Sequence, residues 1–208
     1  MTYNFDNIGN ASFGSIQLKF LNDKKTKGNV PHQKDEWILK TYKSMLGNFR
    51  PKSILEIGIN TGGSLIMWNK LFGCKVVGVD ITYANINQPA MKYINNHQDI
   101  KMYKGNSSIK KRIDHIMSIE FPNGADMIID DGAHNLAVMI PTLDNLWEYA
   151  NKLYVVEDWK ALSQPHRIKL LGKLTQELMG YWPDPSPGKK DPWKFEMYKR
   201  LIAIWRRK

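Results

Sequence analysis

The chain has little cysteine and no long apolar run, and each absence excludes a class of protein. Cys74 is the only cysteine among 208 residues, so the sequence excludes an intramolecular disulfide and a zinc site rich in thiolates. No stretch approaches the ~20 consecutive apolar residues that cross a bilayer. The first residues do not combine a basic start with an apolar stretch, so we expect no signal peptide, no membrane partner and a cytoplasmic location.

The charge of the chain is strongly positive. Lysine and arginine number 30 against 20 aspartates and glutamates, which gives a formal net charge of +10. Many of these cations stand in short runs, such as Lys110-Lys111-Arg112 and Arg206-Arg207-Lys208. A nucleic-acid partner is one explanation. A solvated basic surface is the other, and we favour it because most of these runs fall in expected loops and in the tail.

The spacing of apolar residues predicts strands that alternate with helices. We expect strands at 53–58, 75–80, 100–103, 126–130 and 153–157, and helices at 34–46, 64–72, 109–117, 136–147 and 166–179. This alternation predicts a parallel sheet covered by helices on both faces. Residues 195–205 alternate apolar side chains and predict a terminal hairpin. We expect residues 1–35 to form an irregular lead-in and residues 36–208 to form a single domain.

Acidic residues stand where two of these strands end. Asp131 follows Asp130 at the end of one strand, and Asp158 follows Glu157 at the end of the next. Neighbouring parallel strands place their carboxyl ends at one edge of a sheet, so these carboxylates are expected to converge with His134. Carboxylate oxygens suit a hard cation, and an imidazole beside them can act as a general base. Each motif alone is also an ordinary turn or helix cap, so the hypothesis rests on their combination.

A glycine-rich turn follows the first expected strand. Gly58, Gly62 and Gly63 allow a backbone to approach a ligand closely, but their spacing is neither that of a dinucleotide site nor that of a phosphate loop. Glu56 would repel a pyrophosphate, and it suits a cofactor with an amino group or a cationic centre. Asp80 ends the second strand, where a carboxylate can accept hydrogen bonds from both ribose hydroxyls. The pattern therefore predicts a nucleoside-type cofactor.

These motifs together resemble a known family. Leu55-Glu56-Ile57-Gly58, Gly62-Gly63-Ser64-Leu65 and Val77-Gly78-Val79-Asp80 resemble the cofactor turn of class I S-adenosylmethionine-dependent methyltransferases. Ile129–His134 and Tyr154–Asp158 resemble the acidic motifs of the metal-dependent macrolide sugar O-methyltransferases of the mycinamicin and macrocin type, and of the cephalosporin hydroxylase-like proteins. The resemblance implies an α/β, Rossmann-like class I methyltransferase fold, with a mostly parallel doubly wound sheet and an antiparallel C-terminal strand.

The resemblance also implies roles for individual residues. Mg²⁺ would be held by Asp131, Glu157 and Asp158, and His134 would act as the general base. The residues implied in binding S-adenosylmethionine are Glu56, Gly58, Gly62, Gly63, Ser64, Asp80, Asn106, Ser107 and Asp130. For Asp130, support of the metal ligands is an alternative role.

The resulting hypothesis is an S-adenosylmethionine- and Mg²⁺-dependent O-methyltransferase that acts on a hydroxyl of a sugar or a sugar-bearing small molecule. The acceptor is most simply a glycoside, and assembly into a homo-oligomer is left open. An RNA ribose 2′-O-methyltransferase, or another nucleic-acid methyltransferase, is the alternative that the net charge favours. Against it, Glu157 stands where the known ribose methyltransferases with a Lys-Asp-Lys-Glu set have a lysine. A binding module without activity is disfavoured by the intact acidic set.

Overall fold

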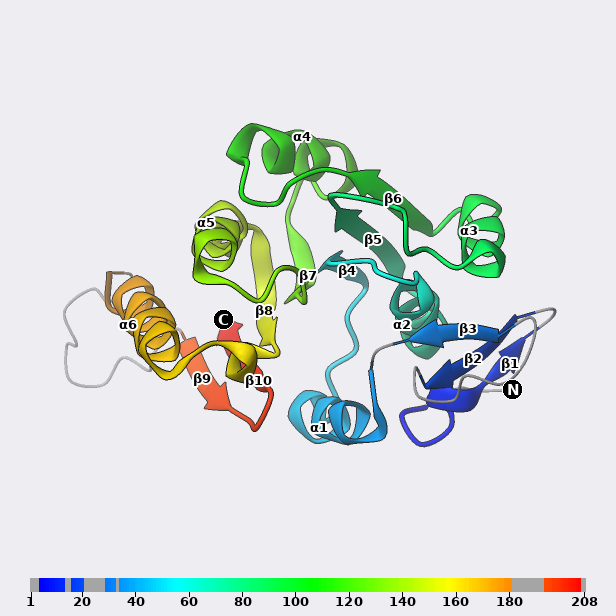
Figure 1. The fold of residues 1–208 in the computed structure, drawn as a ribbon, viewed down its shortest axis with the longest axis horizontal. Coiled ribbons are helices and arrows are strands. Elements are labelled where there is room, and N and C mark those ends of the chain that lie inside the picture. The colour runs from blue at the N-terminus through cyan, green and yellow to red at the C-terminus, as the bar shows by residue number, and fades with distance from the viewer. Residues whose placement is uncertain (1–3, 14–15, 21–28, 33, 181–192, 207–208) are drawn as a thin grey trace. The chain divides into compact units, whose positions relative to one another are not determined.

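The structure is a computed structural model that describes residues 4–13, 16–20, 29–32, 34–180 and 193–206 (Figure 1). The chain divides into two compact units, an N-terminal unit, Met1–Asn106, and a C-terminal unit, Ser107–Lys208. The expectation of one domain over residues 36–208 stays a prediction. Within the described part of the chain, none of the helices combines the length and the apolar character that crossing a bilayer requires.

Three parallel strands form the centre of the N-terminal unit. They are β4 (Ser53–Ile57), β5 (Lys75–Asp80) and β6 (Ile100–Lys104), in the order β6-β5-β4. The middle residues of β4 and β5 are buried without a break, which is the pattern of strands covered on both faces. All three strands were predicted within two residues of their observed bounds. For β4 and β5 the reason is that a short buried apolar run carries a strong signal.

Three helices accompany these strands: α1 (Glu36–Leu46), α2 (Gly63–Phe72) and α3 (Gln88–Asn95). Asp35 caps α1 by accepting a hydrogen bond of 2.8 Å from the backbone N–H of Ile38. The rings of Tyr42 and Trp68, whose centroids are 4.8 Å apart, join α1 to α2. Helix α3 was not predicted, because its only buried residues, Ala90 and Ile94, form a single pair at helical spacing and do not repeat it.

The N-terminal unit also contains a small second sheet. It consists of β1 (Ser12–Phe13), β2 (Ile16–Phe20) and β3 (Asn29–His32) in the order β1-β2-β3, and is preceded by a 3₁₀ turn, η1 (Ile8–Asn10). The expectation of an irregular lead-in is therefore wrong for the described part of this segment. The strands are short and their core consists of single residues such as Leu18 and Val30, so the alternation is too brief to be recognised. Helix α2 contacts both β3 and β5.

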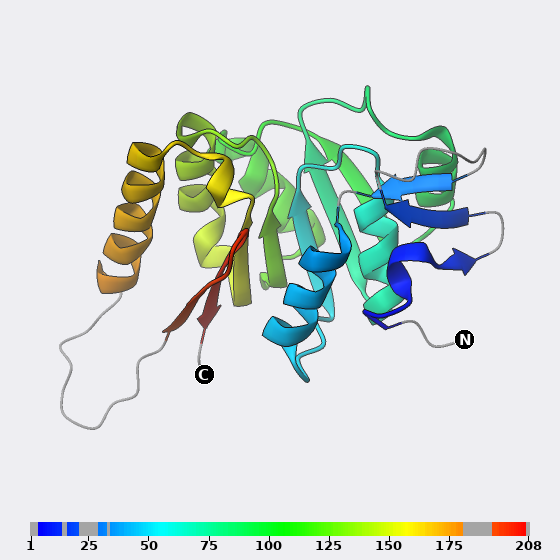
Figure 2. The same cartoon turned by 60° about the horizontal axis from the view of Figure 1, so that its bottom comes forward.

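The C-terminal unit is built on the strands β7 (Ala125–Asp130), β8 (Ala150–Glu157), β9 (Trp193–Met197) and β10 (Leu201–Arg206). Their order is β7-β8-β10-β9; β7 and β8 are parallel, and β10 is antiparallel to both of its neighbours. The predicted terminal hairpin is confirmed as β9 and β10, which Figure 2 shows in red. Leu201 pairs with Glu157, so the hairpin begins its second strand beside the end of β8.

The helices of the C-terminal unit are α4 (Lys110–Glu120), α5 (Leu136–Leu146) and α6 (Gln164–Gly180), with short 3₁₀ turns η2 (Trp147–Tyr149) and η3 (Trp159–Ala161). Helix α5 contacts β7, α4 and α6. Asn135 caps α5 by accepting a hydrogen bond from the backbone N–H of Val138. Pro141 lies inside α5, and the helix continues through it to Leu146.

Candidate functional site

The glycine turn between β4 and α2 needs glycine for its backbone shape. Gly58 has a φ of 90° and Gly62 a φ of 82°, and residues that carry a side chain rarely adopt these backbone angles. The N–H of Gly58 donates a hydrogen bond of 2.9 Å to the carbonyl of Val79, which ties the turn to the end of β5. Asn60, with a φ of 44°, adds a third left-handed residue to the same turn.

Gly62 and Gly63 also allow other parts of the N-terminal unit to pack closely against the turn. A Cβ added at Gly63 would lie 2.2 Å from the carbonyl oxygen of Pro31 on β3, and a Cβ at Gly62 would lie 3.3 Å from the side chain of Ala90. The hydroxyl of Thr61 donates a hydrogen bond of 2.6 Å to the same Pro31 oxygen. Strand β3 thus packs directly against the turn. The role of these glycines in binding a cofactor stays a prediction.

Asp80 holds the glycine turn from the end of β5. Its Oδ2 accepts hydrogen bonds from the backbone N–H groups of Ile59 at 2.8 Å and Asn60 at 3.2 Å. Its Oδ1 accepts a bond of 3.2 Å from the N–H of Thr82. A carboxylate offers about four acceptor positions, so these three bonds leave capacity for a hydroxyl group. The predicted contact with ribose is compatible with this arrangement and stays a prediction.

Glu56 is fully buried and already faces a cation of the chain. The Nζ atom of Lys34 lies 3.1 Å from Glu56 Oε1, and the indole N–H of Trp68 donates to the same oxygen at 3.4 Å. Sequence reasoning assigned Glu56 to a cationic centre of the cofactor and missed Lys34. A single lysine in a polar segment carries no sign that it will be buried. Ser64, in the first turn of α2, is buried as well.

The residues that follow β6 fall in different units. Asn106 is half-buried and ends the N-terminal unit. The hydroxyl of Ser107 lies 2.7 Å from that of Thr142 on α5, and its carbonyl accepts a hydrogen bond of 2.9 Å from the amide of Asn145. Ser107 is therefore held inside the C-terminal unit by α5. The predicted cofactor contacts of Asn106 and Ser107 stay predictions.

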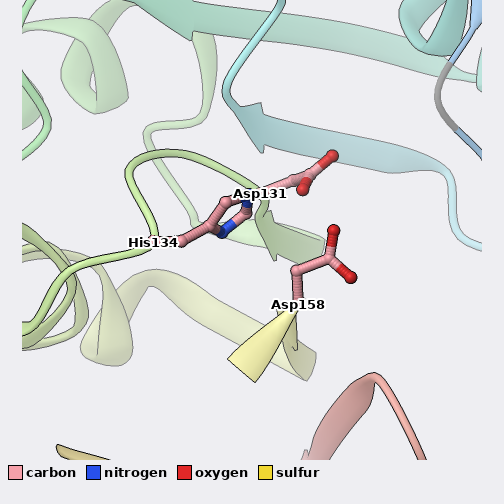
Figure 3. A group of neighbouring side chains, drawn as sticks. All are labelled: Asp131, His134 and Asp158. Carbon is pink, nitrogen blue, oxygen red and sulfur yellow. The ribbon is translucent and has the colours of Figure 1, made fainter. Parts of the chain in front are cut away.

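Three side chains of the C-terminal unit converge, as Figure 3 shows. Asp131 follows β7, His134 lies in the loop before α5, and Asp158 follows β8. One ligand atom from each lies within 4.8 Å of the others, and carboxylate oxygens of Asp131 and Glu157 come equally near. The register of the two parallel strands, with Asp130 opposite Val156, explains why these distant segments meet.

We define the acidic cluster as Asp131, His134, Glu157 and Asp158. Its donors are carboxylate oxygens with one imidazole and no thiolate, which is a set that suits Mg²⁺ better than zinc. Asp131 and Asp158 are half-buried, Glu157 is buried, and His134 is exposed. The residues present therefore fit a hard divalent cation. Solvent could reach that cation from the side of His134.

Asp158 has a partner that the sequence did not indicate. Arg200, on the turn between β9 and β10, donates from Nε to Oδ1 at 2.5 Å and from a terminal nitrogen to Oδ2 at 2.9 Å. Asp158 itself has a φ of 50°, in the left-handed region that aspartate tolerates better than most residues. The ion pair became visible only with the structure, because 42 residues separate its partners.

Asp130, the last residue of β7, is buried in the C-terminal unit. Its Oδ2 accepts a hydrogen bond of 3.4 Å from the hydroxyl of Tyr154, and its Oδ1 one of 3.4 Å from the N–H of Gly132. Burial raises the pKa of Asp130 to about 7, and the negative charge of Asp131 adds to this. Both roles left open for Asp130, contact with the cofactor and support of the predicted metal ligands, stay predictions.

Comparison with known families gives a match over most of the site. Residues 29–159 match the family model described as rhamnosyl O-methyltransferase/CmcI, which is more than half of the chain. This stretch contains the glycine turn and every member of the acidic cluster. No curated protein matches the chain.

Solved structures share the fold at low sequence identity. The MycE methyltransferase from the mycinamycin biosynthetic pathway, in complex with Mg, SAH and mycinamycin VI, has a TM-score of 0.65 and 22% identity, over 84% of this chain and 50% of that chain. The chain thus spans about half the length of MycE. A putative caffeoyl-CoA O-methyltransferase from Staphylococcus aureus has a TM-score of 0.55 and 16% identity, over 86% of each chain.

A chain of the fibrillarin/NOP5P complex is similar to a lesser degree, with a TM-score of 0.51 and 11% identity over 81% of this chain and 80% of that chain. At these identities the similarities show the fold. They confirm the predicted α/β class, with a mostly parallel sheet and antiparallel strands at the C-terminus. With its fold and its family model in agreement, the chain has the class I methyltransferase fold and belongs to the rhamnosyl O-methyltransferase/CmcI family.

Proposed function

We propose that the chain is an S-adenosylmethionine- and Mg²⁺-dependent O-methyltransferase that acts on a hydroxyl of a sugar or a sugar-bearing small molecule. The observation that carries the proposal is the acidic cluster, in which Asp131 comes within 4.8 Å of His134, Glu157 and Asp158. Membership of the rhamnosyl O-methyltransferase/CmcI family supports the reaction and the sugar acceptor. The complex of MycE with Mg, SAH and mycinamycin VI supports the metal, the cofactor and the acceptor class.

Asp131, Glu157 and Asp158 are the residues that would hold the cation. When bound, Mg²⁺ supplies positive charge that lowers the pKa of a sugar hydroxyl beside it. The carboxylates themselves orient the acceptor by fixing where that charge lies. Their positions at the ends of β7 and β8 rest on a packed sheet, so little movement is needed to form the site.

His134 is the proposed general base. It is exposed beside Asp131, at a position that an incoming acceptor can reach. When bound, S-adenosylmethionine would supply a methyl group that the acceptor oxygen takes from its sulfur, which leaves as a neutral thioether. His134 would take the proton that the hydroxyl loses. A nearby carboxylate such as Asp131 stabilises the imidazolium that results.

The glycine turn is the proposed cofactor site. It lies at the carboxyl ends of β4 and β5, where open parallel sheets bind their ligands. Asp80 keeps acceptor capacity for ribose hydroxyls, and Gly58 shapes the turn. The complete proposed set is Glu56, Gly58, Gly62, Gly63, Ser64, Asp80, Asn106, Ser107 and Asp130.

A methyl-transfer assay tests the proposal. The full chain is incubated with S-adenosylmethionine labelled on the methyl group and with a panel of rhamnose-bearing glycosides, with RNA as a separate arm because of the net charge of +10. We expect labelled glycoside with Mg²⁺ and none with EDTA or in Asp131→Asn. Asp99→Asn, at an exposed loop position of the N-terminal unit, should keep full activity. Full activity in EDTA would refute the metal role, and label in RNA alone would refute the sugar acceptor.

A further inference from the structure

We propose that Arg200 is a positioning residue for the acidic cluster, because its guanidinium fixes the carboxylate of Asp158 in the orientation that faces Asp131 and His134. The inference rests on the proposed metal site and extends that site to the turn between β9 and β10. This turn follows the stretch that matches the family model, so the family match says nothing of it.

The first argument is the geometry of the ion pair. Nε and a terminal nitrogen of Arg200 each donate to a different oxygen of Asp158, at 2.5 and 2.9 Å. Two parallel bonds from a rigid guanidinium fix the plane of the carboxylate as well as its place. Each oxygen of an ionised carboxylate offers about two acceptor positions, and Arg200 donates one hydrogen bond to each oxygen of Asp158. The carboxylate can therefore bind a cation and Arg200 together.

The second argument is the backbone of Asp158. Aspartate tolerates a φ of 50° better than most residues, and contacts around Asp158 stabilise it in this conformation. The turn between β9 and β10 supplies such contacts on both sides. Trp159 donates from its indole N–H to the carbonyl of Tyr198 at 3.1 Å, and Leu201 pairs with Glu157 in the sheet. Arg200 lies between Tyr198 and Leu201 in the turn. It contacts Asp158, which lies between Glu157 and Trp159 just after β8.

The positive charge of Arg200 and its placement of Asp158 have opposite effects on cation binding. A positive group beside the acidic cluster weakens cation binding by repulsion, whereas correct placement of Asp158 strengthens it. The substitution Arg200→Lys separates the two effects, because lysine keeps the charge and loses the paired donors. If Arg200 positions Asp158, Arg200→Lys weakens cation binding. If Arg200 acts through charge alone, this substitution leaves cation binding unchanged.

The test is a Mn²⁺ titration of the full chain, in which electron paramagnetic resonance measures the free ion. Neither cofactor nor acceptor is present. We expect Arg200→Lys to bind Mn²⁺ about 10-fold to 100-fold more weakly than the unchanged chain, as is typical when the support of a ligand is lost. Arg167→Lys, on α6 of the same unit, should leave the affinity unchanged. Far-ultraviolet circular dichroism confirms that each variant is folded at the temperature of the titration.

Two further variants make the outcome decisive. In an Asp158→Asn background, Arg200→Lys should cause no additional loss, because the effect passes through the Asp158 carboxylate. Arg200→Gln should also weaken binding, although it removes the repelling charge. Unchanged affinity in Arg200→Lys, tighter binding in Arg200→Gln, or an equal loss in the Asp158→Asn background would each overturn the inference. Absence of Mn²⁺ binding to the unchanged chain would instead overturn the proposed metal site, and the role of Arg200 with it.

Discussion

Lys34 and Glu56 form an ion pair in the interior of the N-terminal unit, with Lys34 Nζ 3.1 Å from Glu56 Oε1 and with neither side chain more than 1% exposed. Removing one partner of such a pair leaves an uncompensated charge out of water, which is far more costly than losing an exposed pair. The pair joins the segment before α1 to the end of β4, next to the glycine turn. It therefore ties the segment between β3 and α1 to the strand that leads into the proposed cofactor site.

Loss of Lys34 should destabilise the fold strongly. We expect Lys34→Met to lower the free energy of unfolding by about 3–5 kcal/mol, because the buried carboxylate of Glu56 would then lose the ammonium group beside it. Urea titration followed by tryptophan fluorescence measures this change. Adding Glu56→Gln to Lys34→Met should restore part of the loss, since the second substitution removes the isolated charge.

The matched control for this substitution is Lys40→Met. Lys40 forms an exposed pair with Glu36 one turn away on α1, and such pairs contribute little. Its loss should leave the urea midpoint nearly unchanged. Equal midpoints for Lys34→Met and Lys40→Met would show that burial of the first pair does not matter to stability.

A methyl group at Gly63 should disrupt the contact between α2 and β3. The added carbon would lie 2.2 Å from the backbone oxygen of Pro31, so the two elements must separate. We expect Gly63→Ala to lower the free energy of unfolding by about 1–3 kcal/mol, the usual cost of overpacking. Thermal unfolding measures this change.

Gly172 provides the opposite case. It lies within α6, and a Cβ added there would meet nothing within 4 Å. Gly172→Ala should therefore stabilise the protein by about 0.5–1 kcal/mol through the higher helix propensity of alanine. If Gly63→Ala were as stable as the unchanged protein, β3 would not be seated on the glycine turn as the structure has it.

His32 should make stability depend on pH. The ring is buried, its Nε2 lies 2.8 Å from the carbonyl oxygen of Gly9, and burial lowers its pKa below the ordinary value of 6.5. The unfolded chain then binds the proton more readily than the folded chain, so the free energy of unfolding falls as the pH drops below about 6.5. Above that pH the contribution is complete and constant.

His32→Gln isolates this contribution, because glutamine has an amide donor and does not titrate. Urea titrations at several values between pH 5 and 8 give the difference in unfolding free energy between the unchanged protein and the variant. As the pH falls, we expect the free energy of unfolding of the unchanged protein to decrease relative to that of His32→Gln. A difference that stays constant over this range would mean that His32 does not titrate differently in the two states.

Most of the fold could be predicted from the sequence, because each buried strand is a local run of apolar residues. The strands at 53–57, 75–80 and 125–130 each read as an apolar stretch with a turn on both sides, and they appear where expected. Helix α3 and the small second sheet were missed. Their burial depends on single residues, such as Ile94 and Val30, that become core only when distant elements cover them.

The acidic cluster could be predicted for a related reason. Asp131 and Asp158 each follow a strand, and a parallel pairing of adjacent strands is enough to bring such residues together. Lys34 and Arg200 could not be predicted. Each reaches its partner only through the packing of a separate element, and nothing in the local sequence distinguishes them from the other lysines and arginines of a basic chain.

The central claim is that the acidic cluster holds one divalent cation through Asp131, and calorimetric titration of the full chain with Mg²⁺ tests it most directly. Asp131 is the member that comes within 4.8 Å of the other three, so its loss should affect the site most. The account predicts one binding site in the unchanged chain and in Asp99→Asn, with affinity at least about tenfold weaker in Asp131→Asn. Equal Mg²⁺ affinity in Asp131→Asn and the unchanged chain would contradict it.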